Sequence, residues 1–416
     1  MPHILIWSIS ALSIALMLLR PFRIPEVVWT ASGALLLCVL GLMPWRLAGH
    51  AVAEGLDVYL FLTGMMLLSE LAKIHGVFDW LATIAVKHGD GSPARLFALI
   101  YGVGTVVTIF MSNDATAVVL TPAVLTAVKR AQVKPLPYLL ICAMIANAAS
   151  FVLPISNPAN LVVFHSAMPP LPRWLAMFAL PSIVSIAVTY LMLRWYCRSE
   201  MSEPCNGSDV EKRLSTSGRV SLFGILSVAV VLLVASALKL ALGLPTCLAS
   251  LVIAAIVLIR ERSSPLHVIR DISWSVLPLV AALFVIVEAV KSAGALQMLR
   301  GALLHAMQWP AALSALAVGG SVGFGTNLVN NLPLGLIAGA TLQTVPAHLA
   351  LAKAVLIAVD LGPNLSITGS LATILWLIAI RREGMHMSGW QFLKAGMIIM
   401  PVSLVFTLGA ALLFGN

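Results

Sequence analysis

Long apolar runs separated by short polar stretches recur along nearly the whole chain. They lie at residues 4–19, 27–43, 58–68, 175–193, 220–238, 248–259 and 392–414. Most approach the roughly 17–25 residues that a membrane-spanning helix needs. The first run differs from a secretory signal, which carries its positive charge ahead of the apolar stretch, because Arg20 and Arg23 follow it. We therefore predict an all-α polytopic membrane protein in which this run is a permanent span.

Two apolar segments contain a similar polar interruption. The first interruption begins at Asn147 and ends at Asn160, and the second begins at Asp360 and ends at Thr373. Each passes through proline and small polar residues. Polar, non-helical backbone survives at membrane depth only where protein covers it or where it lines a cavity. Paired breaks in two halves of a chain are typical of a transporter's binding site. The pattern predicts broken helices at 137–164 and 352–380.

Two further interruptions predict re-entrant hairpins. Ser112, Asn113 and Asp114 divide the apolar stretch 96–128, and a similar polar group occurs at Asn330 and Asn331. We expect polar hairpin tips near 112–116 and 327–333. Each tip is expected to join two arms of half the length of a span, since the polar residues fall near the middle of the apolar stretch.

These features recur in the same order in the two halves of the chain. The motif E-x-x-K-x-x-G occurs at Glu70 and again at Glu288, and a hairpin and a break follow each copy. Such a repeat predicts two related units, at 1–197 and 220–416, joined by a cytoplasmic linker at 198–219. An odd number of crossings in the first unit inverts the second. The prediction is two inverted-topology repeats with about ten transmembrane helices, two hairpins and two broken helices.

The basic residues test this topology. If the amino terminus is outside, all but six of the 25 lysines and arginines fall on the inner side, as the positive-inside rule expects. The six exceptions are Arg46, Arg173, Lys239, Lys291, Arg300 and Lys353. We therefore place both termini outside, with the first hairpin opening inward and the second outward. If each hairpin is instead two full crossings, every loop lies on the same side of the membrane as before. The distribution of basic residues therefore does not distinguish the two topologies.

Composition narrows the class of protein. Hydrophobic residues make up 60% of the chain and charged residues 10%, with a mean hydropathy of +1.01, which excludes a soluble globular protein. The net charge of +9 carries topology information in a membrane protein, so no nucleic-acid partner is expected. The five cysteines show no C-x-x-C spacing. We expect no enzyme, cofactor or resident metal, because no nucleophile–base pair or metal-ligand motif occurs.

Four acids lie within or beside apolar segments. Glu70 and Glu288 each precede a lysine by three residues, which predicts an ion pair on one helix face. Asp114 and Asp360 lie beside helix breaks, where a costly buried carboxylate is usually functional. These two are the candidate proton-coupling residues. The candidate substrate-binding residues are the amides and hydroxyls of the tips and breaks: Asn113, Thr116, Asn147, Ser156, Asn157, Asn160, Asn330, Asn331, Asn364, Ser366, Thr368, Ser370 and Thr373.

Neither break contains Arg, Lys or His. A polyanion such as citrate would depend on helix dipoles and cotransported cations there. A small, neutral polyhydroxy solute suits amides and hydroxyls better, because these groups both donate and accept hydrogen bonds. A carboxyl group then remains available to carry a coupling proton.

The tip and break motifs resemble those of the ion transporter superfamily, and within it the ArsB-type arsenite/antimonite efflux permeases. The resemblance covers essentially the full chain and rests on Ser112-Asn113-Asp114-Ala115-Thr116, on Asn327-Leu328-Val329-Asn330-Asn331-Leu332-Pro333, and most specifically on the stretch from Asp360-Leu361-Gly362-Pro363-Asn364 to Thr373. It implies export of arsenite or antimonite in exchange for protons across a bacterial or archaeal inner (plasma) membrane. In some bacteria it also implies association with a cytosolic arsenite-stimulated ATPase, which nothing in this sequence requires.

Three other functions fit parts of the pattern. A sodium/proton antiporter of the same superfamily would use Asn113, Asp114 and Asn147 to hold sodium. The element Asn157-Pro158-Ala159-Asn160 is shared with sodium-coupled carboxylate symporters, although the absence of basic residues at the breaks disfavours that substrate class. A channel with the same polar pore would need no carboxylate that changes protonation.

Overall fold

The structure is a computed structural model that describes residues 2–164, 168–201, 214–346 and 349–413. These residues form helices and connecting loops, with no strand among them. The first half contains α1 (Pro2–Leu19), α2 (Glu26–Val39), α3 (Trp45–Glu54), α4 (Leu56–Ile74), α5 (Val77–Gly89), α6 (Pro93–Met111), α7 (Asn113–Ala115), α8 (Thr121–Arg130), α9 (Leu136–Ala148), α10 (Pro158–Phe164) and α11 (Leu171–Tyr196).

The second half repeats this order of elements. It contains α12 (Thr216–Ala237), α13 (Gly243–Glu261), α14 (Pro265–Asp271), α15 (Val276–Ser292), α16 (Ala295–Ala306), α17 (Ala311–Val329), α18 (Asn331–Gln343), α19 (Leu349–Leu361), α20 (Leu371–Arg382) and α21 (Gly389–Leu413). Most of the predicted linker, residues 202–213, lies outside the described residues. The division into two repeats joined by that linker stays a prediction about domains.

Six helices are long and apolar enough to cross a membrane: α6, α11, α12, α13, α17 and α21. The bent pairs α3–α4 (47°) and α14–α15 (40°) raise the number to eight if each pair is one span. The helix at His3–Leu19, α2 and α9 are apolar but shorter. The all-α, multi-span fold with two hairpins and two broken helices is thus confirmed for the described part of the chain.

The hairpin arms are longer than predicted. Helices α6 and α17 have 19 residues each, about 28 Å at 1.5 Å per residue, so the expectation of half-length arms is wrong. The reason for α6 lies at its start, where the Ser92 side chain accepts a hydrogen bond from the N–H of Arg95 and Pro93 occupies the first turn. This cap begins the helix before the apolar stretch on which the prediction was based.

Both hairpins turn at equivalent residues with unusual backbone geometry. Ser112 has φ 116° and ψ 161°, and Asn330 has φ 78° and ψ 152°. Each side chain also caps the helix that follows, since Ser112 accepts from the N–H of Ala115 and Asn330 from the N–H of Leu332. Positive φ at a non-glycine residue costs energy and occurs mostly at functional or strongly constrained turns.

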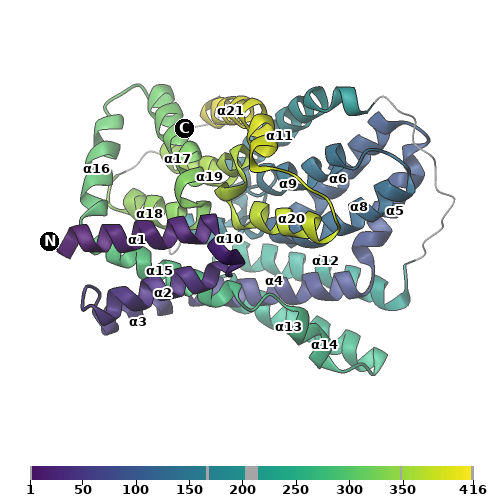
Figure 1. Cartoon of the computed structure of the whole chain (residues 1–416), viewed down its shortest axis with the longest axis horizontal. Helices are drawn as coiled ribbons and strands as arrows, with labels where there is room; N and C mark the ends of the chain where they lie inside the picture. Colours follow the sequence, from purple (N-terminus) through teal and green to yellow (C-terminus); the bar gives the residue numbers. More distant parts are fainter. Residues whose placement is uncertain (1, 165–167, 202–213, 347–348, 414–416) are drawn as a thin grey trace.

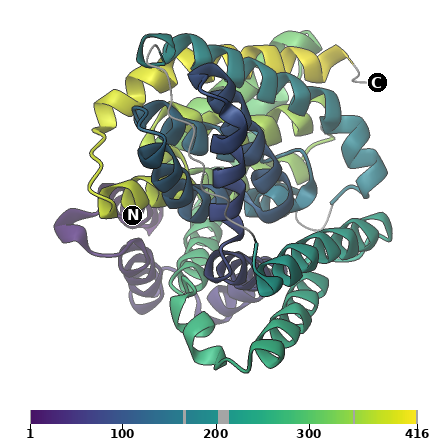
Figure 2. The ribbon, with the colours of Figure 1, turned by 90° about the vertical axis from the view of Figure 1, so that its right-hand side faces the viewer.

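The helices form two groups (Figure 1). Helices α1–α4 and α12–α15 contact one another in the first group, in which α4 packs on α13 and α2 on α15. The second group contains the hairpins, the broken helices and the long pair α11 and α21, which pack together. Figure 2 shows the end of the molecule, with α12 and α13 in teal and green beside the second group.

Helices α9 and α19 lie at the centre of the second group. Nearly every residue of both is buried, as expected of helices that are apolar on all faces. Each leads directly into a break. The rigid centre of the fold therefore holds the start of both polar segments.

Candidate functional site

The first break is held open by its own amides. Helix α9 ends at Ala148 and α10 begins at Pro158, with only a short 3-10 turn, Pro154–Ser156, between them. The side-chain N–H2 group of Asn160 donates to the carbonyl oxygens of Ser150 (2.9 Å), Leu153 (3.3 Å) and Pro154 (3.3 Å). Asn160 thus replaces hydrogen bonds that a continuous helix would have made.

The second break is held by Asn327, which the sequence-based list of site residues missed. Its Nδ2 donates to the Gly362 carbonyl at 3.0 Å. Its Oδ1 accepts from the N–H and the hydroxyl of Ser366, at 3.0 and 2.8 Å. Its main-chain carbonyl accepts from the hydroxyl of Thr368 at 2.9 Å. Asn327 lies on α17, so these bonds attach the second hairpin to the second break.

The two breaks are hydrogen-bonded to each other. Asn147 Nδ2 donates to Asn364 Oδ1 at 2.9 Å and to Thr373 Oγ1 at 3.3 Å. Asn147 Oδ1 accepts from the Ser370 hydroxyl at 3.3 Å, and Asn364 Nδ2 donates to the Met144 carbonyl at 3.0 Å. All four polar side chains are at most 1% exposed. Polar groups from the two halves of the sequence therefore converge, as predicted.

Asp360 joins this network through one hydrogen bond. Asn157 Nδ2 donates to Asp360 Oδ1 at 2.8 Å, whereas Oδ2 has no hydrogen-bond partner among the described residues. The side chain is fully buried, and no Lys, Arg or His forms an ion pair with it in the described part of the chain. An ionised carboxylate in such surroundings needs a proton or a cation to offset its desolvation.

A cavity of about 20 Å³ lies between the hairpin tips and the breaks and is here called the central cavity. Its lining comes from six places in the chain: Leu62, Asn113, Asp114, Asn157, Pro158, Val276, Val280, Asn331, Leu332, Ser370, Leu371 and Ala372. Both halves contribute matching positions, since Asn113 corresponds to Asn331 and Asn157 to Ser370. The one titratable lining residue is Asp114, whose counterpart in the second half is Leu332.

The structure sorts the predicted site residues into two sets. Asn113, Asp114, Asn157, Asn331 and Ser370 line the central cavity. The others form the surrounding framework: Thr116 bonds to Thr108, Ser156 donates to the Ile109 carbonyl, Asn330 donates to the Thr368 carbonyl, and Asn147, Asn160, Asn364, Ser366, Thr368, Thr373 and Asp360 take part in the bonds described above. Leu62, Val276 and Val280 also line the cavity. The sequence-based list of site residues missed these apolar residues because it selected site residues by their polar side chains.

The two acid–lysine motifs form the predicted ion pairs. Lys73 Nζ lies 2.9 Å from Glu70 Oε1, and Lys291 Nζ lies 2.7 Å from Glu288 Oε2. Each pair ends a long helix just before a glycine with positive φ, Gly76 or Gly294. These pairs therefore belong to the ends of α4 and α15 rather than to the central cavity.

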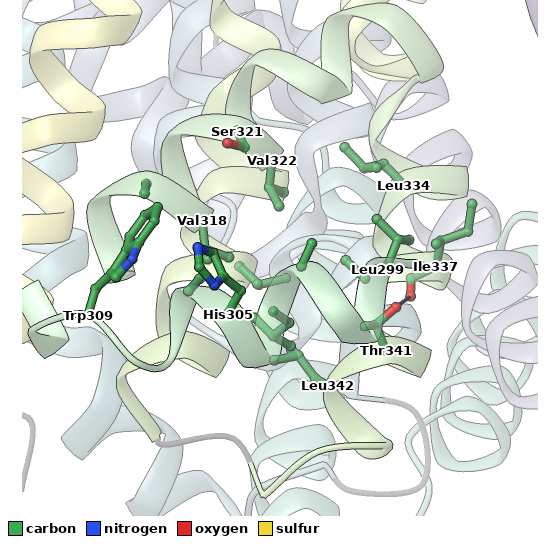
Figure 3. Close-up of a pocket in the computed structure, with 16 residues that line it drawn as sticks. Leu299, His305, Trp309, Val318, Ser321, Val322, Leu334, Ile337, Thr341 and Leu342 are labelled. Carbon is green, nitrogen blue, oxygen red and sulfur yellow. Dashed lines mark hydrogen bonds between the residues drawn. The ribbon is translucent and has the colours of Figure 1, made fainter. Parts of the chain in front are cut away.

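A much larger groove, of about 380 Å³, lies between α16, α17 and α18 (Figure 3). Its lining is almost wholly apolar, and Figure 3 shows its few polar groups, among them His305, Ser321 and Thr341, set among leucine, isoleucine and valine. No break residue and no carboxylate lines it. Such a surface suits contact with lipid chains, so the groove is not the polar site.

A helical membrane protein whose two broken helices and two hairpins enclose a shared polar cavity is a secondary transporter in architecture. The chain belongs to the citrate transporter family, whose model matches residues 8–362. It is similar to the arsenical pump membrane protein of Escherichia coli (strain K12), with 25% identity over 97% of each chain. It is also similar to the putative arsenical pump membrane protein of Bacillus subtilis (strain 168), with 23% identity over 94% of each.

The fold is also found in a solved structure. The YdaH transporter of Alcanivorax borkumensis, described as having an unusual topology, matches 88% of this chain and 86% of its own with a TM-score of 0.57. Sequence identity is 15%, so this likeness concerns the fold alone. Together, the family and its relatives identify a multi-pass membrane transporter.

Proposed function

We propose that the protein exports arsenite and antimonite, as neutral trihydroxides, in exchange for protons. One observation carries the proposal: the central cavity combines the neutral polar side chains of Asn113, Asn157, Asn331 and Ser370 with a single carboxyl group, Asp114, and no basic residue lines it. The relatives named as arsenical pumps support the choice of substrate.

The substrate chemistry matches these side chains. Arsenite near neutral pH is an uncharged trihydroxide, whose hydroxyls both donate and accept hydrogen bonds, as asparagine amides do. The four described cysteines are buried, and none lines the central cavity. Recognition through hydrogen bonds is therefore favoured over thiolate coordination. A volume of about 20 Å³ holds little more than one water molecule, so the hairpin tips must separate to admit the substrate.

A neutral substrate gains nothing from the membrane potential, so active export needs a charged partner. One proton moving inward supplies about 2.3 kcal/mol per 100 mV. At about 1.4 kcal/mol for each tenfold ratio, this supports a gradient of about 40-fold. We infer that protonation of Asp114 and binding of the substrate exclude each other, because both take place in the same small cavity.

Asp360 has a different proposed role. It lies behind the cavity lining and accepts a hydrogen bond from Asn157, so it orients that amide toward the substrate. The two candidate proton-coupling acids thus have different proposed roles. Asp114 couples the proton, and Asp360 positions a binding residue. The proposal also includes an orientation in the inner membrane with both termini outside and a cytosolic arsenite-stimulated ATPase as a partner.

The test is transport by inverted vesicles from a bacterium that lacks its own arsenite exporters. Vesicles containing the protein should accumulate arsenite and antimonite when energised, and a protonophore should abolish the accumulation. Sodium uptake under the same conditions would favour the sodium/proton antiporter. Sodium-dependent uptake of citrate into intact cells would favour the carboxylate symporter. Arsenite flux that stays downhill and ignores the protonophore would indicate a channel.

A further inference from the structure

A second polar cavity lies at the other end of α4 from the acid–lysine pair. It has a volume of about 330 Å³ and is here called the outer vestibule. Its polar lining consists of Glu54, Asp57, Ser236 and Lys239. These residues come from the end of α3, the start of α4, the end of α12 and the loop before α13, all of which the distribution of basic residues places outside.

The outer vestibule is built to hold polar solute rather than to be filled by protein. Ser236 is 4% exposed and lines the vestibule, yet its hydroxyl has no hydrogen-bond partner among the described residues. Buried hydroxyls normally have a partner, often water. Asp57 uses one carboxylate oxygen to accept from the N–H of Gly243 at 2.7 Å, which fixes the junction of α4 with α13 at the wall of the vestibule.

Helix α4 connects this vestibule to the central cavity. Val58 lines the vestibule, and Leu62, one turn further along, lines the central cavity. Leu161 on α10 lines the vestibule, while Asn157 and Pro158 at the start of that helix line the central cavity. Helices α4 and α10 are in contact. The two spaces are thus one helical turn apart along both walls, yet they share no lining residue.

The central cavity instead adjoins a third cavity, which lies toward the other end of α4. A cavity of about 70 Å³, the inner vestibule, is lined by Ser69, Glu70 and Asp271. It shares Leu62, Asp114, Pro158 and Val276 with the central cavity. The basic residues near Glu70 and Asp271 place this end of α4 on the inner side. The central cavity thus directly adjoins the inner vestibule, whereas it shares no lining residue with the outer vestibule.

We propose that Val58, Leu62 and Leu161 form the outer gate, and that the outer vestibule is the portal through which the small polyhydroxy solute leaves. The three gate side chains are at most 5% exposed. These side chains separate the outer vestibule from the central cavity by apolar contacts alone. A modest movement of α10 against α4 breaks such contacts without leaving a charge unpaired. This inference rests on the proposed function for the identity of the solute and on the proposed orientation for the side of the membrane.

The experiment measures access from each side with a membrane-impermeant thiol reagent, on ice and without substrate, in a Cys205→Ser background. Ser236→Cys should be labelled from outside. Ser221→Cys, also a buried serine on α12 without a hydrogen-bond partner among the described residues, lines none of the cavities described above and should stay unlabelled. Because a minor conformation is populated to about 10% or less, Leu371→Cys, which lines the central cavity and is not part of the gate, should react from outside at least about tenfold more slowly than Ser236→Cys.

The gate is then opened by truncation. Adding Leu161→Ala should remove most of that rate difference, whereas Leu244→Ala, at a side chain 55% exposed on α13, should leave it unchanged. Failure of Ser236→Cys to react from outside overturns the portal. Equal rates at Ser236→Cys and Leu371→Cys without truncation overturn the gate. Each result is independent of arsenite transport, so the gate can fail while the proposed function stands.

Discussion

Replacing Asp114 with asparagine holds this side chain in an uncharged form. Asparagine has nearly the same shape and keeps the hydrogen-bonding capacity of the cavity lining, but it cannot take up a proton. Asp114 is the only carboxyl group among the residues that line the central cavity, and its counterpart Leu332 offers no substitute. Because asparagine resembles the protonated carboxyl group, which excludes the substrate, we expect Asp114→Asn to bind arsenite more weakly than the wild type and not to accumulate it.

The magnitude follows from the electrical work. A proton contributes about 2.3 kcal/mol per 100 mV, which corresponds to a concentration ratio of about 40 at about 1.4 kcal/mol per tenfold step. Loss of coupling removes the whole of this contribution, so the steady-state ratio in energised inverted vesicles should fall from about 40 to about 1. Downhill flux, measured in the same vesicles without a proton gradient, should fall because binding is weaker, and an unchanged Tm of the detergent-solubilised variant should show that it folds.

Asp271→Asn is the matched control, because Asp271 lines the inner vestibule but not the central cavity. It should accumulate arsenite to nearly the wild-type ratio. If Asp114→Asn vesicles also reach a ratio near 40, and a protonophore still abolishes it, Asp114 is not the coupling residue and the proposed competition fails.

Three further substitutions test the framework. Asp360→Asn should raise KM in the vesicle assay by about tenfold, equivalent to about 1.4 kcal/mol, while the accumulation remains sensitive to protonophore; complete uncoupling would contradict its positioning role. Asn147→Ala leaves buried partners unsatisfied at about 1–3 kcal/mol each, so detergent-solubilised protein should melt several degrees lower, and an unchanged Tm would show that the bonds between the breaks contribute little. Gly396→Ala places a Cβ 2.2 Å from the Leu365 carbonyl oxygen and should lower both Tm and transport, whereas Gly409→Ala on the same helix, with open space around it, should change neither.

The sequence predicts the breaks and tips well because few residue types tolerate those positions. Prolines at 158 and 363 and the clustered amides have no place in a lipid-exposed helix, and the structure interrupts its helices there. The acid–lysine pairs are equally local, since three residues on a helix fix their geometry. Features that depend on residues close together in the chain can therefore be predicted from the sequence alone.

Tertiary packing determined the rest. Asn160 and Asn157 look alike in the sequence, yet Asn160 satisfies carbonyls of its own loop while Asn157 lines the central cavity. Leu62 and Val280 are indistinguishable from other apolar residues on α4 and α15 until those helices are placed against the tips. Asn327 belongs to the second hairpin motif, but its hydrogen bonds to the second break depend on how α17 packs against that break.

The most direct test of the shared central cavity is an experimental structure of the protein with antimonite, located by the anomalous scattering of antimony. We expect one strong peak among Asn113, Asn157, Asn331 and Ser370, with Asp114 beside it and the hairpin tips further apart than in the closed cavity. A peak confined to the outer vestibule or to the groove beside α16, with none between the tips and the breaks, would contradict it.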